Sequence, residues 1–458
     1  MAALQKLKVL EQCKIAPPCS VPSTTLPLTF FDIPWLLFSP TQPLFFFDFP
    51  NSTSHFLHSI LPDLKLSLSL SLHRYFPLAG SLLSPPPPDK PTLSYATGDS
   101  ISLTVAESAA DFNYLSGPSW KEAGEFHHLV PWLPATSPCV LAIQVTVFPK
   151  RGVSVGFAFR SVGGDWRTFN NFLKCWASIC RERLDIYCTR VGRISPFYDR
   201  SVIKDPNGLK QILLKQWWKL SSPADPFEIE DKGLKDMVRA TFVVGRLEID
   251  KLNQFVLARS KKLFGSDGLY LSPYVVTCAC IWACLTKARF PNNKSSDEDS
   301  LSFGFVAGSI TRLDYSVPET YLGNCVSFGR STLKNNELVG ENGIVIAAKA
   351  IGETVKKLNQ AVLGGAESWI SDLKELIGSD LHVMVTGSPK LDLYGLDFGW
   401  GRPKKIEEIS IDTSGAVSLT ESREVGGGIE VGLVLPKAHM DSFASLFTKH
   451  LNGLCSDY

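Results

Sequence analysis

The hydrophobic pattern between residues 153 and 181 changes from strand-like to helical within a few positions. In the first part apolar residues alternate with small or polar ones, at Val153, Val155, Phe157 and Phe159. This is the period of a half-buried strand. Beyond Gly163, Gly164 and Asp165, apolar residues recur at helical spacing, at Phe169, Phe172, Leu173, Trp176, Ile179 and Cys180. Asp165 stands at the N-cap position, where a carboxylate accepts hydrogen bonds from the free backbone N–H groups of the first helical turn. The pattern therefore predicts a strand, a glycine turn and a helix.

The rest of the chain changes between the same two periods. Residues 141–147 alternate and reach the first strand through a turn at 149–152, which predicts a hairpin. Further strands are predicted at residues 8–15, 239–247, 301–307, 383–386, 405–411 and 428–435. Helices are predicted at residues 54–72, 275–285, 341–362, 367–377 and 438–451. Strands interleaved with helices in two halves predict an α/β or α+β fold.

A segment rich in polar, proline and glycine residues follows the central helix, at residues 190–208. This composition is typical of a connection between domains. A chain of 458 residues is also too long for one ordinary domain. We therefore predict an N-terminal domain at residues 1–189, a crossover linker at 190–215 and a C-terminal domain at 216–458.

Charge and cysteine usage narrow the classes of function. The formal net charge is +1 with both signs scattered, so the sequence offers no basic stripe for nucleic acid or an anionic membrane. No apolar run reaches transmembrane length, and the N-terminus lacks the apolar core of a signal peptide, which predicts a cytoplasmic protein. The eleven cysteines contain no C-x-x-C pair, which predicts buried reduced thiols and no metal site.

Three short motifs carry a family resemblance. Residues 397–401 read DFGWG, residues 321–325 read YLGNC, and residues 161–166 read SVGGDW. Together they resemble the plant BAHD acyltransferases, which transfer an acyl group from coenzyme A to an alcohol or amine. YLGNC resembles the YFGNC of the anthocyanin and phenolic-glucoside branch, many of whose members use malonyl-CoA. The resemblance implies two chloramphenicol-acetyltransferase-like domains with a solvent channel between them.

The same resemblance suggests roles for individual residues. It implies that Trp35, in the stretch LPLTFFDIPWL, lies near the acceptor side of the channel. It implies a structural loop that shapes the CoA side, formed by Asp397, Phe398, Gly399, Trp400 and Gly401. Asp165 corresponds to the motif aspartate of the family. From the residues alone, the DFGWG segment is a strained turn between strands.

The chain departs from the family at three clustered places. Where the family has His-x-x-x-Asp-Gly, this chain has Ser161 for the histidine and Trp166 for the glycine. The family arginine that pairs with the motif aspartate corresponds to Ile310, while Arg312 remains two residues further on. Asp165 is therefore expected to pair with Arg312 or Arg160, or only to cap its helix. We assign Ser161 and Asp165 as candidate catalytic residues and Arg160, Trp166, Trp35 and Arg312 as candidate substrate-binding residues.

The missing histidine decides the expected chemistry. An imidazole accepts a proton from the acceptor hydroxyl because its pKa lies close to working pH. A serine hydroxyl is neither acid nor base near neutrality, and it becomes a nucleophile only beside a base. A positioned base accelerates a reaction by about 10²–10⁴-fold. None of the eight histidines has an aspartate four residues downstream, so no substitute motif is present.

Three functions stay open from the sequence. The favoured one is a repurposed enzyme that carries out elimination, lyase cleavage or cyclisation of an activated small molecule, with Ser161 as a hydrogen-bond donor. The second is a weakened or substrate-assisted acyltransferase, for which acyl-CoA is the co-substrate. The third is a non-catalytic protein that binds a small molecule in the retained pocket. In each case we expect no cofactor, a small-molecule partner, no nucleic-acid or membrane partner, and a monomer, which is usual in the family.

Overall fold

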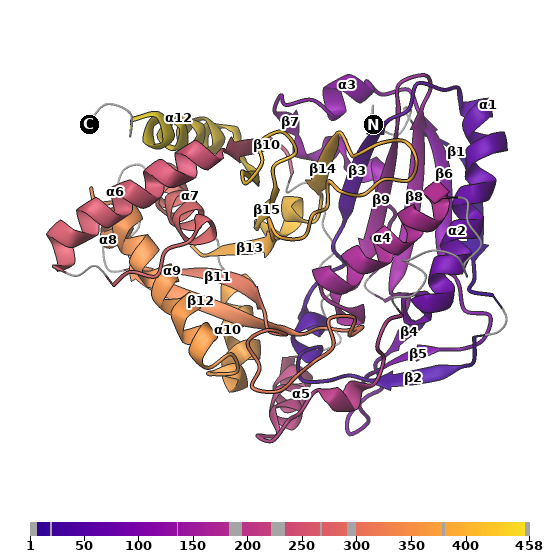
Figure 1. Ribbon diagram of the computed structural model, residues 1–458, viewed down its shortest axis with the longest axis horizontal. Coiled ribbons are helices and arrows are strands. Elements are labelled where there is room, and N and C mark those ends of the chain that lie inside the picture. The colour runs from indigo at the N-terminus through magenta and orange to yellow at the C-terminus, as the bar shows by residue number, and fades with distance from the viewer. Residues whose placement is uncertain are drawn as a thin grey trace.

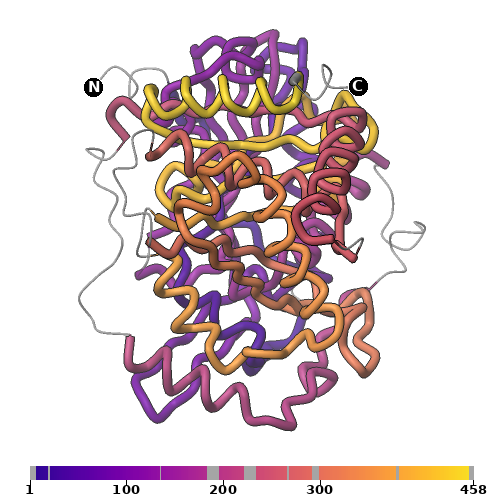
Figure 2. Tube along the Cα trace, turned by 90° about the vertical axis from the view of Figure 1, so that its left-hand side faces the viewer, coloured from indigo at the N-terminus to yellow at the C-terminus, as the bar shows by residue number. Residues whose placement is uncertain are grey.

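The computed structural model describes residues 7–18, 21–134, 136–182, 195–220, 234–265, 268–290, 299–377 and 381–453. Two mixed sheets form the centres of two halves that lie side by side in Figure 1. Figure 2 views the molecule from the C-terminal half, whose orange and yellow trace lies in front of the indigo and magenta one. The predicted α/β class is confirmed.

The N-terminal half contains a six-stranded sheet. Its strand order is β1 (Leu7–Ile15), β6 (Ile101–Ser108), β8 (Leu141–Phe148), β9 (Gly152–Phe159), β3 (Pro43–Asp48) and β14 (Lys405–Glu408). The predicted hairpin is the antiparallel pair β8–β9, with Leu141 opposite Phe159. Every residue of both strands is buried, because the sheet is covered on both faces.

Helices cover one face of this sheet with apolar side chains. The face packs against α2 (Leu61–Arg74) and α4 (Trp166–Glu182), whose buried residues share one core with the strands. A short α1 (Thr53–His55) and a π-helical turn at Phe56–Ile60 precede α2. A separate three-stranded sheet lies beside it, with the order β2 (Thr24–Pro27), β5 (Thr92–Tyr95) and β4 (Ser81–Leu83). The other face of the large sheet packs against residues 112–130, which include α3 (Phe112–Leu115).

The C-terminal half contains a seven-stranded sheet. Its order is β12 (Val326–Lys334), β11 (Ser300–Gly308), β13 (Val383–Gly387), β15 (Val417–Glu421), β16 (Ile429–Pro436), β10 (Met237–Val244) and β7 (Lys121–Glu122). Its helices are α5 (Leu209–Leu220), α6 (Arg246–Phe264), α7 (Pro273–Arg289), α8 (Asn335–Val339), α9 (Gly343–Gln360), α10 (Trp369–Ile377), α11 (Ile411–Ser414) and α12 (Lys437–Gly453). The apolar α7 is the most deeply buried of these, as its uninterrupted run of hydrophobic residues predicts.

The two halves exchange strands. β14 comes from the C-terminal part of the chain but pairs with β3, with Lys405 opposite Phe46. β7 comes from the N-terminal part but pairs with β10, with Glu122 opposite Val238. A buried ionic cluster lies at this junction, where Arg239 of β10 contacts Glu407 at 3.0 Å and also pairs with Asp412. His127 reaches the same Asp412 at 2.8 Å.

Several element boundaries differ from the sequence prediction. The strand predicted at 239–247 ends at Val244, because Gly245 starts α6, which the prediction missed together with β12. The strand predicted at 405–411 ends at Glu408 and gives way to α11. Helix α5 begins inside the predicted linker 190–215, of which residues 190–194 lie outside the described part of the chain. The domain boundaries themselves stay a prediction.

Candidate active site at the end of strand β9

The predicted strand–turn–helix is present around Asp165. Strand β9 ends at Phe159, residues Ser161–Gly163 form one 3-10 turn, and α4 begins at Trp166. The turn is too crowded for a side chain at Gly164, whose Cβ would lie 2.7 Å from the methyl group of Thr168. The turn packs against a second 3-10 helix, Ile33–Leu37, which carries Trp35. The packing of these two turns therefore places Ser161 and Trp35 in the same region of the fold.

Asp165 is a buried helix cap that also holds a distant segment. Its Oδ1 accepts a hydrogen bond from the backbone N–H of Thr168 at 2.9 Å. Its Oδ2 accepts one from the N–H of Cys325 at 3.1 Å and lies 3.5 Å from Arg167 Nη2. The predicted cap is confirmed, whereas the ion pair with Arg160 or Arg312 is not formed. Arg167, in the first turn of α4, supplies the positive charge beside Asp165 instead.

Segment 319–325, which contains YLGNC, is hydrogen-bonded to the start of α4. Arg167 donates to the carbonyl oxygens of Glu319 at 2.7 Å and Tyr321 at 2.8 Å. Thr168 Oγ1 donates to the carbonyl oxygen of Gly323 at 3.0 Å, and the N–H of Gly323 lies 3.2 Å from the same hydroxyl. These contacts join the C-terminal half to the motif helix. They explain why YLGNC accompanies the motif.

A buried polar cluster beneath the turn was not foreseen from the sequence. Asn324 donates to the carbonyl oxygen of Ser161 at 2.8 Å and to Asp32 Oδ1 at 3.0 Å. Asp32 also lies 3.4 Å from Arg200, which donates to the hydroxyl of Tyr321 at 2.9 Å. Burial alone lowers the pKa of Arg200, but the neighbouring Asp32 raises it overall. The one available signal was a lone aspartate inside the apolar run FFDIPW, because a buried carboxylate needs a partner.

The hydroxyl of Ser161 is not hydrogen-bonded to a base in the part of the chain that the structure describes. The side chain is half-buried, and within the described residues its oxygen makes no hydrogen bond. Several of the histidines have polar partners elsewhere in the described residues; for example, His58 contacts Ser54, His127 pairs with Asp412, and His382 accepts from the N–H of Ser302. A serine without such a partner is not activated as a nucleophile. Among the described residues, Ser161 therefore has no hydrogen bond that would activate its hydroxyl.

The four candidate substrate-binding residues have different surroundings. Arg160 donates to the carbonyl oxygens of Cys139 at 3.0 Å, Pro134 at 2.6 Å and Ser137 at 2.9 Å, and burial lowers its pKa. Arg160 thus holds the loop before β8. Arg312 is bound to Asn359 and to the carbonyl oxygen of Gly308, away from Asp165.

The two candidate tryptophans lie close to the turn. Trp166 is half-buried and meets the ring of Phe169 edge-on at 5.7 Å. Trp35 packs between Phe38 and Phe328 at 5.3 and 5.5 Å, and among the described residues its buried indole N–H has no hydrogen-bond partner. An unpaired donor of this kind is costly to bury, so Trp35 is a residue at which a ligand oxygen would be stabilised.

Cys325 lies against Asp165 but is a poor nucleophile. Its thiol is buried, and burial raises its pKa to about 12. Only the thiolate reacts with alkylating agents. We expect native protein at pH 8 to leave Cys325 unmodified by iodoacetamide, while unfolding in guanidinium exposes it to rapid labelling. Mass spectrometry of the peptide that contains Cys325 measures both states. Labelling in the native protein would contradict the buried position.

The DFGWG loop is a structural turn that packs on the N-terminal half. Asp397 Oδ1 accepts from the N–H groups of Gly399 and Gly401 at 2.8 and 2.9 Å, and Arg181 lies 3.8 Å from the other oxygen. Both glycines have a positive φ, +99° and +89°, which side chains rarely adopt. The ring of Phe398 lies 4.8 Å from that of Trp176. These contacts agree with a structural role, while the proposed position beside CoA stays a prediction.

Trp400 contributes to stability through aromatic packing. Its ring contacts those of Phe47, Phe49, Phe56 and Phe398 at 5.3 to 6.2 Å. We expect Trp400→Ala to lower the free energy of unfolding by about 2–3 kcal/mol, because a partly buried aromatic side chain is lost. Guanidinium denaturation measures the change. The variant Trp400→Phe should recover most of it, and equal losses in both variants would contradict a packing role.

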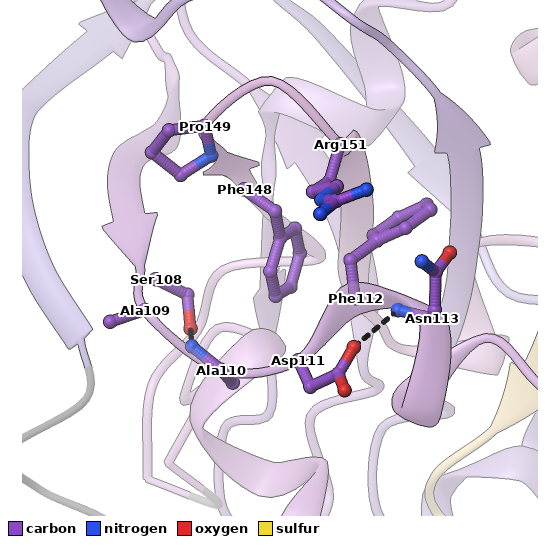
Figure 3. A pocket seen from close by; sticks show the side chains of 9 residues that line it. All are labelled: Ser108, Ala109, Ala110, Asp111, Phe112, Asn113, Phe148, Pro149 and Arg151. Carbon is purple, nitrogen blue, oxygen red and sulfur yellow. Dashed lines mark hydrogen bonds between the residues drawn. The ribbon is translucent and has the colours of Figure 1, made fainter.

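One open cavity lies away from this site. It has a volume of about 440 Å³ and is lined by residues 108–113, Phe148, Pro149 and Arg151 (Figure 3). Its walls lie at the start of β9, whereas Ser161 follows the end of that strand.

Across the described residues, no cluster of three histidine, cysteine or acidic side chains is arranged to hold a metal. Of the eight cysteines in that part, six are buried, and Cys13 and Cys139 are half-buried. None of the described helices has the length and apolarity of a membrane span.

Known proteins resemble this chain along its whole length. It is 37% identical to malonyl-coenzyme A:anthocyanin 3-O-glucoside-6''-O-malonyltransferase of Dahlia pinnata, with 99% of each chain covered. It is 38% identical to phenolic glucoside malonyltransferase 1 of Nicotiana tabacum, over 97% of this chain and 99% of that one. It is 37% identical to coumaroyl-CoA:anthocyanidin 3-O-glucoside-6''-O-coumaroyltransferase 2 of Arabidopsis thaliana, with 98% of each covered.

Solved structures share the fold. Vinorine synthase superposes with a TM-score of 0.70 at 18% identity, covering 96% of this chain and 98% of that one. The F. sporotrichioides protein TRI101, complexed with coenzyme A and T-2, superposes with a TM-score of 0.64 at 14% identity, over 91% and 96%. The transferase family matches residues 5–450. This chain therefore belongs to the transferase family, that of the BAHD acyltransferases, and is similar to its anthocyanin and phenolic-glucoside malonyltransferases.

Proposed function

We propose that this protein is a slow, substrate-assisted O-acyltransferase that takes an acyl-CoA, such as malonyl-CoA, and a glycosylated phenolic acceptor. The similarity to malonyl- and coumaroyltransferases over nearly the full chain supports the substrate classes. The low rate of acyl transfer that we propose rests on Ser161, because its hydroxyl lacks a hydrogen-bond partner among the described residues. The acceptor or a water molecule then has to remove the proton that an imidazole would take.

The retained frame supports residual catalysis. Asn324 holds the carbonyl of Ser161, and Asp165 holds the N–H of Cys325, so the turn keeps a fixed position between the halves. Holding two reactants in a productive geometry accelerates transfer even without a base. Loss of the base alone lowers the rate by about 10²–10⁴-fold. The expected enzyme is therefore weak but specific.

A thioester-release assay tests this function. Purified protein is incubated with malonyl-, acetyl- or hydroxycinnamoyl-CoA and a panel of phenolic glucosides, and free CoA is measured together with the acylated product. We expect slow turnover that requires both substrates. Release of CoA without an acylated product would contradict acyl transfer, and turnover at the rates of ordinary enzymes would contradict the missing base.

A second function rests on Trp166. In place of the family's glycine, this indole stands at the start of α4, directly after the turn that carries Ser161, and packs on Phe169. A bulky ring there favours a reshaped pocket for elimination, lyase cleavage or cyclisation, which need no base to activate an acceptor. The sequence alone favoured this chemistry, but the full-length relatives favour acyl transfer. Product formation from a single CoA-free substrate would establish the second function, and binding without any product would indicate a binding protein.

A further inference from the structure

The carbonyl groups of segment 319–325 face two different neighbours in turn. The N–H of Phe197, in the predicted linker, donates to the carbonyl oxygen of Thr320, and the carbonyl oxygen of Phe197 accepts from the N–H of Leu322, both at 2.9 Å. Tyr321, between them, directs its carbonyl oxygen to the other side, where Arg167 donates to it at 2.8 Å. This alternation is that of a strand with two edges.

Arg167 takes the place of a neighbouring strand at the second edge. Its Nη1 donates to the carbonyl oxygen of Glu319 at 2.7 Å, and its Nη2 donates to that of Tyr321. Nη2 also lies 3.4 Å from the carbonyl oxygen of Gly323, which the hydroxyl of Thr168 reaches at 3.0 Å. In a sheet, carbonyl groups of alternate residues accept from backbone N–H groups of the next strand. A guanidinium carries five N–H donors in one plane, so a single side chain satisfies several of them.

The same segment holds the turn that carries Ser161. The side chain of Asn324 donates to the carbonyl oxygen of Ser161 at 2.8 Å. The N–H of Cys325 donates to Asp165 Oδ2 at 3.1 Å, and Arg167 Nη2 lies 3.5 Å from that same oxygen. The contacts thus run from Arg167 through the segment to the turn, and through Asp165 back to α4. The position of the segment therefore determines the position of the turn.

We propose that Arg167 is a positioning residue for acyl transfer. Its guanidinium replaces a neighbouring strand, fixes segment 319–325, and thereby sets the position of the turn at residues 161–164. It acts through Asn324 and Asp165. The role in catalysis deepens the proposed function and rests on it, whereas the positioning of the turn can be tested without turnover.

Hydrogen–deuterium exchange followed by mass spectrometry tests the positioning. In Arg167→Met the carbonyl oxygens of Glu319 and Tyr321 lose a charged donor, so we expect the peptides covering residues 319–325 and 161–168 to exchange about 10- to 100-fold faster. The peptide covering β11 should exchange at its wild-type rate, because β11 is held by its ladder with β12. Unchanged exchange in either site peptide, or an equal increase in β11, would overturn the proposal.

Two further variants separate geometry from charge. Arg167→Lys keeps a positive charge beside Asp165, but its single ammonium group cannot span the carbonyl groups, so it should recover only a small part of the lost protection. Complete recovery would show that the charge suffices and would overturn the strand-like role. The matched control is Lys174→Met, which removes a positive charge from the same helix, where Lys174 pairs with Asp392 at 2.9 Å on the surface. It should leave exchange at residues 161–168 and 319–325 unchanged, and an increase like that of Arg167→Met would also overturn the proposal.

Steady-state kinetics distinguish positioning from substrate binding. With malonyl-CoA and arbutin, a phenolic glucoside, we expect Arg167→Met to lower kcat about 10- to 100-fold, because a small misplacement of a reacting site is costly. KM for both substrates should stay unchanged. A raised KM with an unchanged kcat would make Arg167 a substrate-binding residue and overturn the proposal. A wild type that forms no acylated product would contradict the proposed function, and the exchange at residues 161–168 would still decide whether Arg167 positions the turn.

Discussion

Ser161→His is expected to raise the rate of acyl transfer from malonyl-CoA to a phenolic glucoside by about 10²–10⁴-fold. The substitution restores a group whose pKa lies near working pH at the end of β9, where a serine cannot accept a proton. The backbone at this position is already fixed, because Asn324 holds the Ser161 carbonyl and Asp165 caps the following helix. Single-turnover release of CoA under saturating substrates measures the chemical step directly.

The control for this substitution is Ser161→Ala. It removes the hydroxyl without adding a base, and we expect it to match the wild type within a few-fold, because that hydroxyl has no activating partner among the described residues. A strong loss in Ser161→Ala would instead give the hydroxyl a chemical role. The double variant Ser161→His, Trp166→Gly separates the base from the pocket. If only the double variant gains acyltransferase activity, Trp166 blocks the acceptor. If neither variant gains it, the natural substrate is expected to contain no CoA.

Arg239→Met is expected to lower the free energy of unfolding by about 3–5 kcal/mol, the largest stability effect that we predict. Arg239 is 1% exposed and contacts the carboxylates of Glu407 and Asp412, which are themselves buried. Its guanidinium also donates to the carbonyl oxygen of Glu408 at 3.0 Å. The variant leaves buried negative charge with too few partners. Guanidinium denaturation followed by circular dichroism measures the change.

Two comparisons make this result specific. Lys174→Met breaks the ion pair with Asp392 on the surface, where both side chains are largely exposed, and should cost at most about 1 kcal/mol. The triple variant Arg239→Met, Glu407→Gln, Asp412→Asn removes the charges together and should recover part of the loss. A single variant as stable as the wild type would contradict a structural role for the cluster.

The segment around Asp165 was predictable because its signals are local. The alternation before Phe159, the glycines and the helical spacing after Asp165 each act within a few residues, and the structure confirms the strand, turn and cap. The buried α7 was visible for the same reason, as a long apolar run. The family motifs then associated this turn with YLGNC and DFGWG, although distances between the three segments cannot be read from a sequence.

The partners of the site residues were not predictable, because they depend on contacts between distant segments. Of the three alternatives for Asp165, the sequence could not choose the helix cap that is formed, whereas Arg160 binds three loop carbonyls and Arg312 binds Asn359. Arg167 lay two residues from Asp165 in the sequence, yet only the docked YLGNC segment explains its orientation. Arg200 has no sequence signal at all. Its role depends on Asp32 and Tyr321 meeting it in the fold.

The exchange of strands between the halves has a consequence for biosynthesis. During translation β3 emerges early, but its neighbour β14 is synthesised only near the end of the chain. The edge of the first sheet therefore remains open while most of the protein is being made, and an open edge is prone to pair with other chains. Expression of the N-terminal half alone would make this exposure permanent. This edge therefore closes only once the chain has been synthesised as far as β14.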